Sequence, residues 1–474
     1  MNLPKVSVIT VNFNGKDYLA GLLSSLYSLD YPADSLEIIM VDNASNDGSV
    51  EFVKNNFPEV KIVCSSKNTG FAGGNNRGAL HAKGDYLAFI NNDCEVDVNW
   101  LRSLADAAAK MENDQKAGSF GSKVLFFFKY IILDFILDKD LSVSIKEEKI
   151  TSKNTGSGFL FKKAQDSLKF LNGSFSLSRD LEGNIIRRTK GIFRAAVPVF
   201  DLNQDIVFDF KYLASGSGNL SILLEGRELF SRSLQDKGPG LPGQKPDDLK
   251  FESASINISK EYFIFAKDIV NSAGSEINKS FYAREIGYET IDQSVLPGDD
   301  EGEAENIKEV FALPGSSFMI KRELYEECGL FDEKFFTYYE DIDFFYRARL
   351  KGWKAYCVLD SKARHFHCGS GKEWSKSFTY FVLRNRIIMI YKNAPFFVFL
   401  KNYFSFSAAA FINLAYTLAA RLKGNRVQRI DIPLRFKIVF EMFVIIFTKI
   451  KSRVKNRMYS KVSDKEIKKW AAIF

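Results

Sequence analysis

The sequence contains few residues suited to disulfide or zinc chemistry. Its five cysteines are Cys64, Cys94, Cys328, Cys357 and Cys368. They show no paired spacing, which argues against a disulfide framework and against a zinc site built from cysteine pairs. We therefore expect reduced cysteines and a cytosolic protein. The amino terminus, Met-Asn-Leu-Pro-Lys, leads directly into an apolar run, so we expect no signal peptide.

Two common nucleotide-binding motifs are also missing from the N-terminal part of the chain. Residues 1–100 contain neither a G-x-G-x-x-G sequence nor a P-loop. Their absence weighs against a dinucleotide-binding protein and against a kinase-type nucleotide site. We find no nucleic-acid-binding motif either.

The composition is that of a globular protein with large apolar cores. A length of 474 residues favours two or three domains. Hydrophobic residues make up 46% and charged residues 26% of the chain, which is ordinary for a soluble protein. The 44 phenylalanines far outnumber the 19 tyrosines. This apolar material suffices for several cores and leaves some for a membrane surface.

Positive charge is concentrated in the C-terminal part of the chain. From Arg386 to Phe474 there are 18 Lys or Arg and 4 Asp or Glu, so the rest of the chain is net acidic although the formal net charge is +7. Because Phe, Ile and Leu are interspersed with these basic residues, the pattern indicates an anionic membrane surface as a partner. Nucleic acid is the weaker alternative, since the apolar content is high.

Strands and helices alternate in the first hundred or so residues, and three of the strands end in polar side chains. Residues 6–11 form an apolar run followed by Asn12, residues 37–41 are followed by Asp42, and residues 86–90 by Asn91-Asn92-Asp93. A helix with leucines at helical spacing is expected over residues 17–29, and another strand over 60–63. This alternation predicts an α/β fold with a doubly wound parallel sheet.

The polar strand ends predict a binding site at one edge of that sheet. In open α/β sheets, ligands bind beyond the carboxyl ends of the strands. Asp42 can accept hydrogen bonds from a base or ribose, and Asp93 suits a hard cation such as Mg²⁺ or Mn²⁺ that bridges to a diphosphate. The glycines of residues 70–74 can bring backbone amides close to a diphosphate. The alternatives are a polar turn in which Asp93 caps the next helix, and an ordinary loop and helix start at residues 70–74.

Residues 6–100 resemble the nucleotide-sugar half of family-2 glycosyltransferases of the GT-A fold. The resemblance rests on residues 8–15, 41–49, 68–76 and 91–93. It implies a UDP- or dTDP-sugar donor and a divalent metal, Mn²⁺ or Mg²⁺, held by Asp93. The donor residues that it implies are Val11, Asn12, Asp42, Asn68, Gly70, Gly73, Asn91 and Asn92. Asn91 stands where the family's D-x-D motif has its first Asp, a departure typical of rhamnosyltransferase-like relatives.

The pattern changes between residues 126 and 268. Short alternating segments separated by turn-rich pieces replace the helical periodicity, for example residues 206–210, 220–224 and 251–258. Regularly spaced strands of this kind predict an antiparallel β-sandwich, here inserted into the first domain. A carbohydrate-binding role and a scaffold or oligomer-contact role are equally open.

Residues 269–393 resemble the acceptor half of the same family. Residues 311–322 are similar to the acceptor-side loop and strand, which implies acceptor contacts from Gly315 and Ser316. Trp374, in a segment that resembles a bacterial subset of the family, is the third expected acceptor residue. A helix from about Glu340 begins with three acids, Glu340, Asp341 and Asp343. They can stabilise the helix start or supply a general base for a sugar hydroxyl. The resemblance assigns the base to Asp341, next to Glu340.

Two of the three histidines, His365 and His367, form a His-x-His pair that points both rings to one face of a strand. Such a pair can bind a metal, contact the diphosphate or serve the structure. The family often has a histidine here, beside the metal and the pyrophosphate. The resemblance therefore favours His365 as a second metal ligand.

The C-terminal region, residues 394–474, is predicted to be helical and associated with a membrane. Residues 402–420 are uncharged and long enough to cross about 30 Å, but they include two Asn, two Ser and a Thr. Residues 433–449 are apolar and interrupted by Arg435, Lys437 and Glu441. We favour helices lying on the cytoplasmic face of the membrane over a true span. A helical appendage packed on the catalytic domain or on a partner chain is the alternative.

These observations predict four regions: a nucleotide-sugar half (1–125), an inserted β-domain (126–268), an acceptor half (269–393) and a helical, basic C-terminal region (394–474). With the resemblance, they predict an inverting glycosyltransferase, possessing a GT-A-type mixed sheet, that moves a sugar to a saccharide or lipid-linked acceptor in bacterial cell-surface polysaccharide synthesis. Rhamnose from a dTDP donor is the expectation by analogy. Two other classes stay open: a non-catalytic carbohydrate-binding or scaffold protein, and a sugar nucleotidyltransferase.

Overall fold

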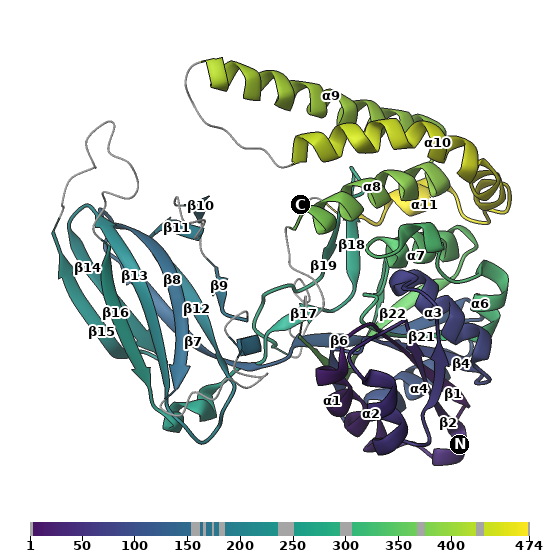
Figure 1. Cartoon of the computed structure of the whole chain (residues 1–474), viewed down its shortest axis with the longest axis horizontal. Helices are drawn as coiled ribbons and strands as arrows, with labels where there is room; N and C mark the ends of the chain where they lie inside the picture. The colour runs from purple at the N-terminus through teal and green to yellow at the C-terminus, as the bar shows by residue number, and fades with distance from the viewer. Residues whose placement is uncertain are drawn as a thin grey trace. The chain divides into compact units, whose positions relative to one another are not determined.

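The structure, a computed structural model, describes residues 3–152, 162–164, 167–172, 175–179, 185–235, 251–293, 306–366, 375–422 and 431–472. The chain divides into two compact units (Figure 1). The first unit comprises Met1–Leu125, Asn271–Tyr288 and Ser294–Phe474. The second comprises Phe126–Val270 and Glu289–Gln293. Each unit is described by itself below.

The first unit is built on a ten-stranded mixed sheet. Its main path runs β20-β22-β6-β21-β4-β1-β2-β3, with β17 paired to β6 and β5 paired to β22. The strands are β1 (Val6–Asn12), β2 (Leu36–Asp42), β3 (Lys61–Cys64), β4 (Tyr86–Ile90), β5 (Cys94–Val96), β6 (Ala117–Phe126), β17 (Val270–Ser272), β20 (Ile307–Val310), β21 (Ser317–Lys321) and β22 (Lys354–His365). Strands β4, β1, β2 and β3 are parallel, whereas β21 runs antiparallel to β4 and β6. The predicted α/β class with a mixed sheet is confirmed.

The registers of two strand pairs determine where polar side chains meet. Asn12 pairs with Asp42 at the ends of the parallel strands β1 and β2. On the other side of the sheet, His365 pairs with Cys94 where the antiparallel strands β22 and β5 meet. The first pairing joins neighbouring elements of the chain, and the second joins segments far apart in sequence.

Helices cover this sheet and contribute its largest buried side chains. They are α1 (Lys16–Tyr27), α2 (Ser49–Asn56), α3 (Gly70–His81), α4 (Trp100–Lys110), α6 (Arg322–Cys328) and α7 (Glu340–Leu350), with short 3₁₀ turns η1 (Ala33–Ser35) and η4 (Glu333–Phe335). Four leucines of α1 at helical spacing are fully buried, as the periodicity predicts. Trp100 of α4 is also fully buried and donates its indole N–H to Ser122 and Ser317 on two strands.

The second unit contains two five-stranded antiparallel sheets, ordered β10-β11-β8-β13-β16 and β15-β14-β7-β12-β9. The strands are β7 (Lys129–Leu137), β8 (Ser142–Ser152), β9 (Lys169–Leu171), β10 (Ser176–Arg179), β11 (Ile185–Lys190), β12 (Ile192–Val199), β13 (Ile206–Ser215), β14 (Gly218–Leu224), β15 (Arg227–Leu234) and β16 (Glu252–Ile258), followed by η3 (Lys260–Phe265). One apolar core joins the sheets: the rings of Phe135 and Phe210, from different sheets, lie 5.7 Å apart. The expected antiparallel sheets are present, and their role stays a prediction.

A small sheet and four helices complete the first unit. The sheet, β19-β18-β23, consists of Ala283–Glu285, Ser275–Asn278 and Ala471–Ala472. The helices are α8 (Lys376–Asn393), α9 (Phe396–Leu422), α10 (Asp431–Met458) and α11 (Asp464–Lys468). In Figure 1, α9 and α10 run side by side, and α10 packs against both α8 and α9. Among the described helices, one segment, Phe396–Ala419, is long and apolar enough to cross a membrane by length and composition, with a mean hydropathy of 1.2.

Candidate active site

The ends of β1, β2 and β4 bring Asn12, Asp42 and Asn92 together, as the sequence predicts. Asn92 Nδ2 donates to Asn12 Oδ1 at 2.9 Å. Asn12 Nδ2 in turn donates to Ser45 Oγ at 3.1 Å and reaches Asp42 Oδ1 at 3.4 Å. The second oxygen of Asp42 accepts the backbone N–H of Ser45 at 3.0 Å. These hydrogen bonds orient a buried carboxylate at the edge of the sheet where a nucleotide was expected.

The start of α3 is held by its own polar network, in which Asn43 is central. Asn68 Oδ1 accepts the N–H of Gly70 at 2.8 Å. Asn43 Nδ2 donates to the Gly70 carbonyl at 2.9 Å, and Asn43 Oδ1 accepts from Thr69 Oγ1 at 2.9 Å. Asn43 belongs to the family-like segment 41–49 but was not among the predicted donor residues. Its position directly after the strand is the signal that could have identified it.

The glycines of α3 serve close packing. A Cβ at Gly70, where φ is +72°, would lie 2.4 Å from the Phe336 carbonyl oxygen. At Gly73 it would meet the Thr69 side chain at 2.6 Å, and at Gly74 it would meet Val11 at 2.5 Å. These glycines therefore allow α3 to approach β1 and the loop before α7. The expected contact of these glycines with a diphosphate stays a prediction. The expected contact of Val11 with the donor also stays a prediction.

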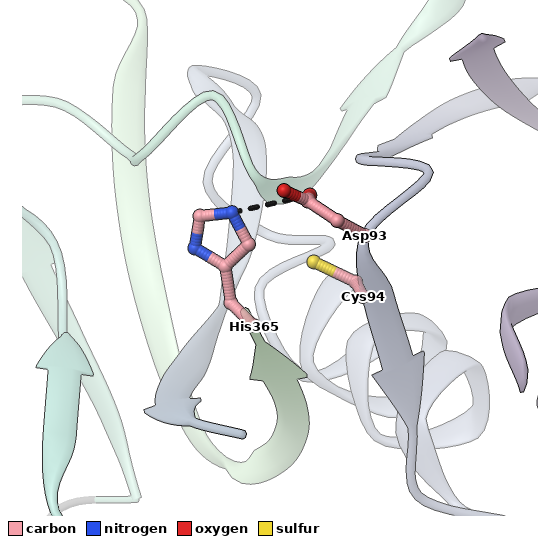
Figure 2. A group of neighbouring side chains, drawn as sticks. All are labelled: Asp93, Cys94 and His365. Carbon is pink, nitrogen blue, oxygen red and sulfur yellow. Dashed lines mark ion pairs between the residues drawn. The ribbon is translucent and has the colours of Figure 1, made fainter. Parts of the chain in front are cut away.

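Asp93, Cys94 and His365 form a group that could hold a metal ion (Figure 2). One ligand atom from each residue lies within 4.8 Å of the others, and His365 Nε2 lies 3.3 Å from Asp93 Oδ1. His365 Nδ1 is 3.0 Å from Asn271 Oδ1. Nδ1 thereby faces an acceptor, and the ring turns its other nitrogen, Nε2, toward Asp93 and toward the Asn91 amide at 3.5 Å.

This arrangement fits a hard divalent cation held by a carboxylate oxygen and an imidazole nitrogen. A carboxylate oxygen and an imidazole nitrogen are both common ligands of such ions, so a cation bound between them would be held by both. Cys94 fits less well, because burial raises the pKa of its thiol well above the usual value and keeps it protonated. Its Sγ lies 3.8 Å from the Ser316 carbonyl oxygen, which accepts from a thiol. Asp93 and His365 are therefore the two candidate ligands.

The three acids at the start of α7 have different environments. Asp343 is fully buried and bound on all sides: Lys392 Nζ lies at 2.7 Å, Arg347 Nε at 3.0 Å and Asn393 Nδ2 at 2.8 Å. Its role is structural. Asp341 instead accepts the backbone N–H groups of Ile342 at 2.7 Å and Gly315 at 3.1 Å, so its carboxylate faces the loop that leads into β21.

Glu340 and Asp341 are a closely spaced acidic pair with perturbed acidity. Burial raises the pKa of Asp341. Burial, followed by the negative charge of Asp341, raises the pKa of Glu340 well above its usual range. Glu340 is 5% exposed, and its Oε2 has no hydrogen-bond partner among the described residues. When one carboxyl group of such a pair is ionised, its negative charge disfavours ionisation of the other. A pair of this kind is suited to accepting and releasing a proton near neutral pH.

The segment before α7 is strained and held from α8. Phe336, Tyr338 and Tyr339 all have positive φ, at 65°, 65° and 68°, a conformation that costs energy for residues with a side chain. Asn385 Nδ2 lies 2.8–3.0 Å from the carbonyl oxygens of Phe335, Thr337 and Tyr338. The amide thereby stabilises the turn that delivers Glu340 and Asp341. The sequence analysis assigned no role to Asn385.

Glu285 is a further carboxyl group that the sequence analysis did not identify. It lies on β19, where its Oε2 accepts from Ser275 Oγ at 2.9 Å and also from Ser272 Oγ. Burial raises the pKa of Glu285 to about 7, and the Asp341 charge adds to this effect while His365 opposes it. Glu285 therefore lies near both the base candidate and the metal group. No local pattern marks it, since one Glu among alternating polar residues is ordinary.

The predicted acceptor residues connect the two halves of the site through their backbone. Gly315 donates its N–H to Asp341, and the next carbonyl, that of Ser316, accepts the N–H of Asn91 at 3.0 Å. A Cβ at Gly315 would lie 3.5 Å from Asp341 Oδ2 and 3.3 Å from the Phe71 ring. Contact with an acceptor stays a prediction. Trp374 and His367 lie outside the described residues.

Comparison with known proteins agrees with this geometry. Residues 7–162 match the family model described as Glycosyl transferase family 2. This region of the chain is therefore similar to family 2 glycosyl transferases. The matched region includes the ends of β1, β2 and β4, and therefore Asn12, Asp42 and Asp93. His365 and Asp341 lie beyond it, and their roles as metal ligand and base stay predictions.

Curated relatives that match part of this chain are glycosyltransferases by name. The "Low-salt glycan biosynthesis hexosyltransferase Agl10" of Haloferax volcanii is 34% identical over 136 residues, which are 28% of this chain and 42% of the relative. The "Poly(ribitol-phosphate) beta-N-acetylglucosaminyltransferase TarS" of Staphylococcus aureus is 32% identical over 108 residues, 22% of this chain and 18% of the relative. The chain thus spans less than half the length of the first curated relatives.

Among solved structures, the "Mannosyltransferase PcManGT from Pyrobaculum calidifontis in complex with GDP-Man and Mn2+" matches over 97% of this chain and 88% of that chain, with 13% sequence identity and a TM-score of 0.39.

Proposed function

We propose that this protein is an inverting glycosyltransferase that moves a sugar from a nucleotide-diphosphate donor to a saccharide or lipid-linked saccharide in cell-surface polysaccharide synthesis. One observation carries the proposal. Adjacent residues, Gly315 and Ser316, hydrogen-bond on one side to the acid Asp341 and on the other to Asn91, which precedes Asp93. A base candidate and a metal-ligand pair therefore flank one short segment in a chain whose residues 7–162 match the family 2 model.

In this proposal the donor lies along the ends of β1, β2 and β4. Asp42, oriented by Asn12 and Ser45, accepts hydrogen bonds from the base or ribose. Asp93 and His365 would hold Mn²⁺ or Mg²⁺, which supplies positive charge against the leaving diphosphate. Asn271 orients His365 for that role through Nδ1.

The transfer itself is a single displacement. The acceptor hydroxyl gives its proton to Asp341 while its oxygen forms a bond to the anomeric carbon. The bond between that carbon and the diphosphate oxygen breaks on the opposite face, so the configuration inverts and the nucleoside diphosphate leaves. The raised pKa of Asp341 makes its carboxylate a stronger base than an exposed aspartate. Beside it, burial and the Asp341 charge raise the pKa of Glu340 well above its usual range.

The donor is proposed to be a UDP- or dTDP-hexose, with dTDP-rhamnose the expectation from the substitution of Asn91 in the metal motif. We further propose that the protein acts at the cytoplasmic face of the membrane, peripherally attached through its C-terminal helices. The excess of basic residues after Arg386 and the apolar helix Phe396–Ala419 support this location.

The deciding experiment is donor hydrolysis by the purified full chain. UDP-, dTDP- and GDP-sugars are offered singly with Mn²⁺, Mg²⁺ or EDTA, and released nucleoside diphosphate is recorded. We expect release from one donor that requires the metal. Absence of both binding and release across the panel would argue for a non-catalytic carbohydrate-binding or scaffold protein.

A further inference from the structure

We propose that the outward faces of α9 and α10 form a docking surface that lies flat on a bilayer containing anionic phospholipid. The inference rests on the membrane association included in the proposed function. It deepens that function by naming the residues, the orientation of the helices and the lipid charge. We call these outward faces the docking face and define them by the residues given below.

The α9 part of the docking face is a regular apolar stripe. Its large side chains are Phe397, Phe404, Phe411 and Leu418, each at least half exposed. They recur every seven residues, which places them along one side of the helix over a length of about 32 Å. The buried residues Phe399 and Phe406, also seven apart, lie on the opposite side, and Ala410 follows one turn later. The helix therefore packs with one side and leaves an apolar side largely exposed, although the Phe411 ring also contacts Phe436 of α10.

The α10 part repeats this arrangement. Its stripe includes Phe440, Phe443, Phe447, Ile450 and Val454. Phe447 is 76% exposed, whereas Ile438 and Met442 on the other side of the helix are fully buried. Large apolar side chains exposed in this way along two neighbouring helices indicate a partner surface.

The charged residues beside these stripes favour a lipid surface over a second copy of the chain as the partner. Helix α9 contains no Asp or Glu. On α10, the exposed Lys451 and Lys455 make no ion pair within the described part of the chain, whereas the acid Glu441 is bound by the Tyr380 hydroxyl at 2.8 Å. Two such faces brought together would place two positively charged surfaces against each other. An anionic bilayer complements both the apolar stripe and the positive charge.

The C-terminal end of α10 adds a shallow groove with matching chemistry. Its volume is about 470 Å³, and it is lined by Ile450, Lys451, Val454, Lys455, Met458 and Tyr459. Apolar side chains form most of its surface, and two ammonium groups lie beside them. This combination suits the upper part of an acyl chain next to a phosphate headgroup.

The attachments of α9 favour an orientation in the membrane plane. Asn402 Oδ1 lies 3.4 Å from an Arg386 guanidinium nitrogen, and the Tyr403 hydroxyl donates to the Val439 carbonyl at 3.0 Å. A helix crossing the bilayer would have to give up both contacts and expose the apolar groups beneath them. Lying flat, α9 keeps these contacts and still buries its stripe in the interfacial region.

The test is flotation of the purified full chain with vesicles of phosphatidylcholine, with or without phosphatidylglycerol. We expect binding only with phosphatidylglycerol and weaker binding at high salt. The double variant Phe440→Gln/Phe447→Gln should bind at least about tenfold more weakly. Lys451→Gln and Lys455→Gln should each cost about fivefold. Leu80→Gln is the matched control, because Leu80 is an equally exposed apolar residue on α3, at 76%.

Donor hydrolysis is recorded for every variant, which separates this inference from the proposed function. Lost vesicle binding with retained hydrolysis supports the docking face, even if no acceptor is identified. Three results would overturn it: no binding of the unaltered chain to either vesicle, equal binding by the double variant, or resistance of bound protein to alkaline carbonate, which indicates a spanning helix. A dimer that is lost with the double variant, together with absent vesicle binding, would assign the face to a second copy.

Discussion

At the residue scale, Asp341 and Asp343 show how two acids on one helix turn acquire different roles. Both lie in the first turn of α7, so their sequence positions are nearly equivalent. Asp343 faces Lys392 and Arg347 and neutralises them, while Asp341 faces backbone N–H groups at the site. Helix spacing places both residues correctly, but only the packing of α8 against α7 determines which acid remains available.

Asp341→Asn should lower the transfer rate by about 10²- to 10⁴-fold, because the amide cannot accept the hydroxyl proton. Donor binding should be kept, since Asp341 lies on the acceptor side of the site. Steady-state transfer and calorimetric donor binding measure the two effects. Glu326→Gln, an exposed acid on α6, is the control. Unchanged turnover in Asp341→Asn would remove Asp341 as the base.

Glu285 predicts a pH dependence of stability. Its pKa is raised from an ordinary value of 4.5 to about 7 in the folded protein, so the folded state keeps the proton that the unfolded state releases. The resulting stability is complete below pH 4.5 and is lost as the pH rises to about 7, by at most about 3 kcal/mol. Urea unfolding across this window measures it.

Glu285→Gln should flatten that dependence, because the neutral amide has no proton to release. The comparison between the two proteins isolates Glu285, since Glu340 and Asp341 titrate in both. An equal loss of unfolding free energy with rising pH in both proteins would show that Glu285 ionises freely in the folded state.

At the element scale, a network of ion pairs connects α7 and the segment before it to α8 and α10. Lys392 of α8 contacts Asp343 at 2.7 Å and Asp332 at 3.0 Å, and Lys449 of α10 contacts Asp332 at 2.6 Å. These pairs lower the pKa of Asp332. The network links the helices of the docking face to the helix that carries Asp341.

Lys392→Met should therefore destabilise the first unit by about 3 kcal/mol, since it leaves Asp343 buried with fewer positive partners. Lys376→Met on the exposed side of α8 is the matched control, for which we expect a change below about 0.5 kcal/mol. Both are measured by urea unfolding. A small effect of Lys392→Met would mean that Arg347 and Asn393 suffice to hold Asp343.

Most elements follow from the sequence because their signals are local. The leucines of α1 repeat at helical spacing, and the alternation in residues 206–210 becomes β13 with Phe208 and Phe210 buried. For the glycines of α3, the sequence does not reveal which segment packs against them. Their pattern indicates close approach, but only the fold reveals that Phe336, more than 260 residues away in sequence, occupies the space beside Gly70.

At the scale of the whole molecule, the main segment of the second unit, Phe126–Val270, begins and ends at neighbouring points. Tyr130 and Lys267 exchange both backbone hydrogen bonds at 2.8 Å, and the Phe126 N–H donates to the Ile269 carbonyl at 2.9 Å. The two ends of this segment are therefore hydrogen-bonded to each other. An insertion with adjacent ends can be shortened without stretching the flanking chain.

Replacing residues 131–266 by a short glycine–serine linker should leave the first unit folded, with donor hydrolysis within about threefold of the full chain. Circular dichroism and the hydrolysis assay measure the two outcomes. Replacing the same residues by an unrelated small domain is the control for linker strain. Loss of hydrolysis in both chimeras would show that the second unit contributes to the site or to its stability.

The sequence by itself determined the class of the fold, the polar ends of β1, β2 and β4, and the acids that begin α7. These features depend on spacing within one element, which periodic burial and short motifs record directly. Only the tertiary structure decided which side chains meet. The pairing of β22 with β5 brings His365 to Asp93. The small sheet places Glu285 near Asp341. Lys392 of α8 binds Asp343, so that this acid is not available at the site. Such meetings join segments far apart in sequence, and no local pattern encodes their register.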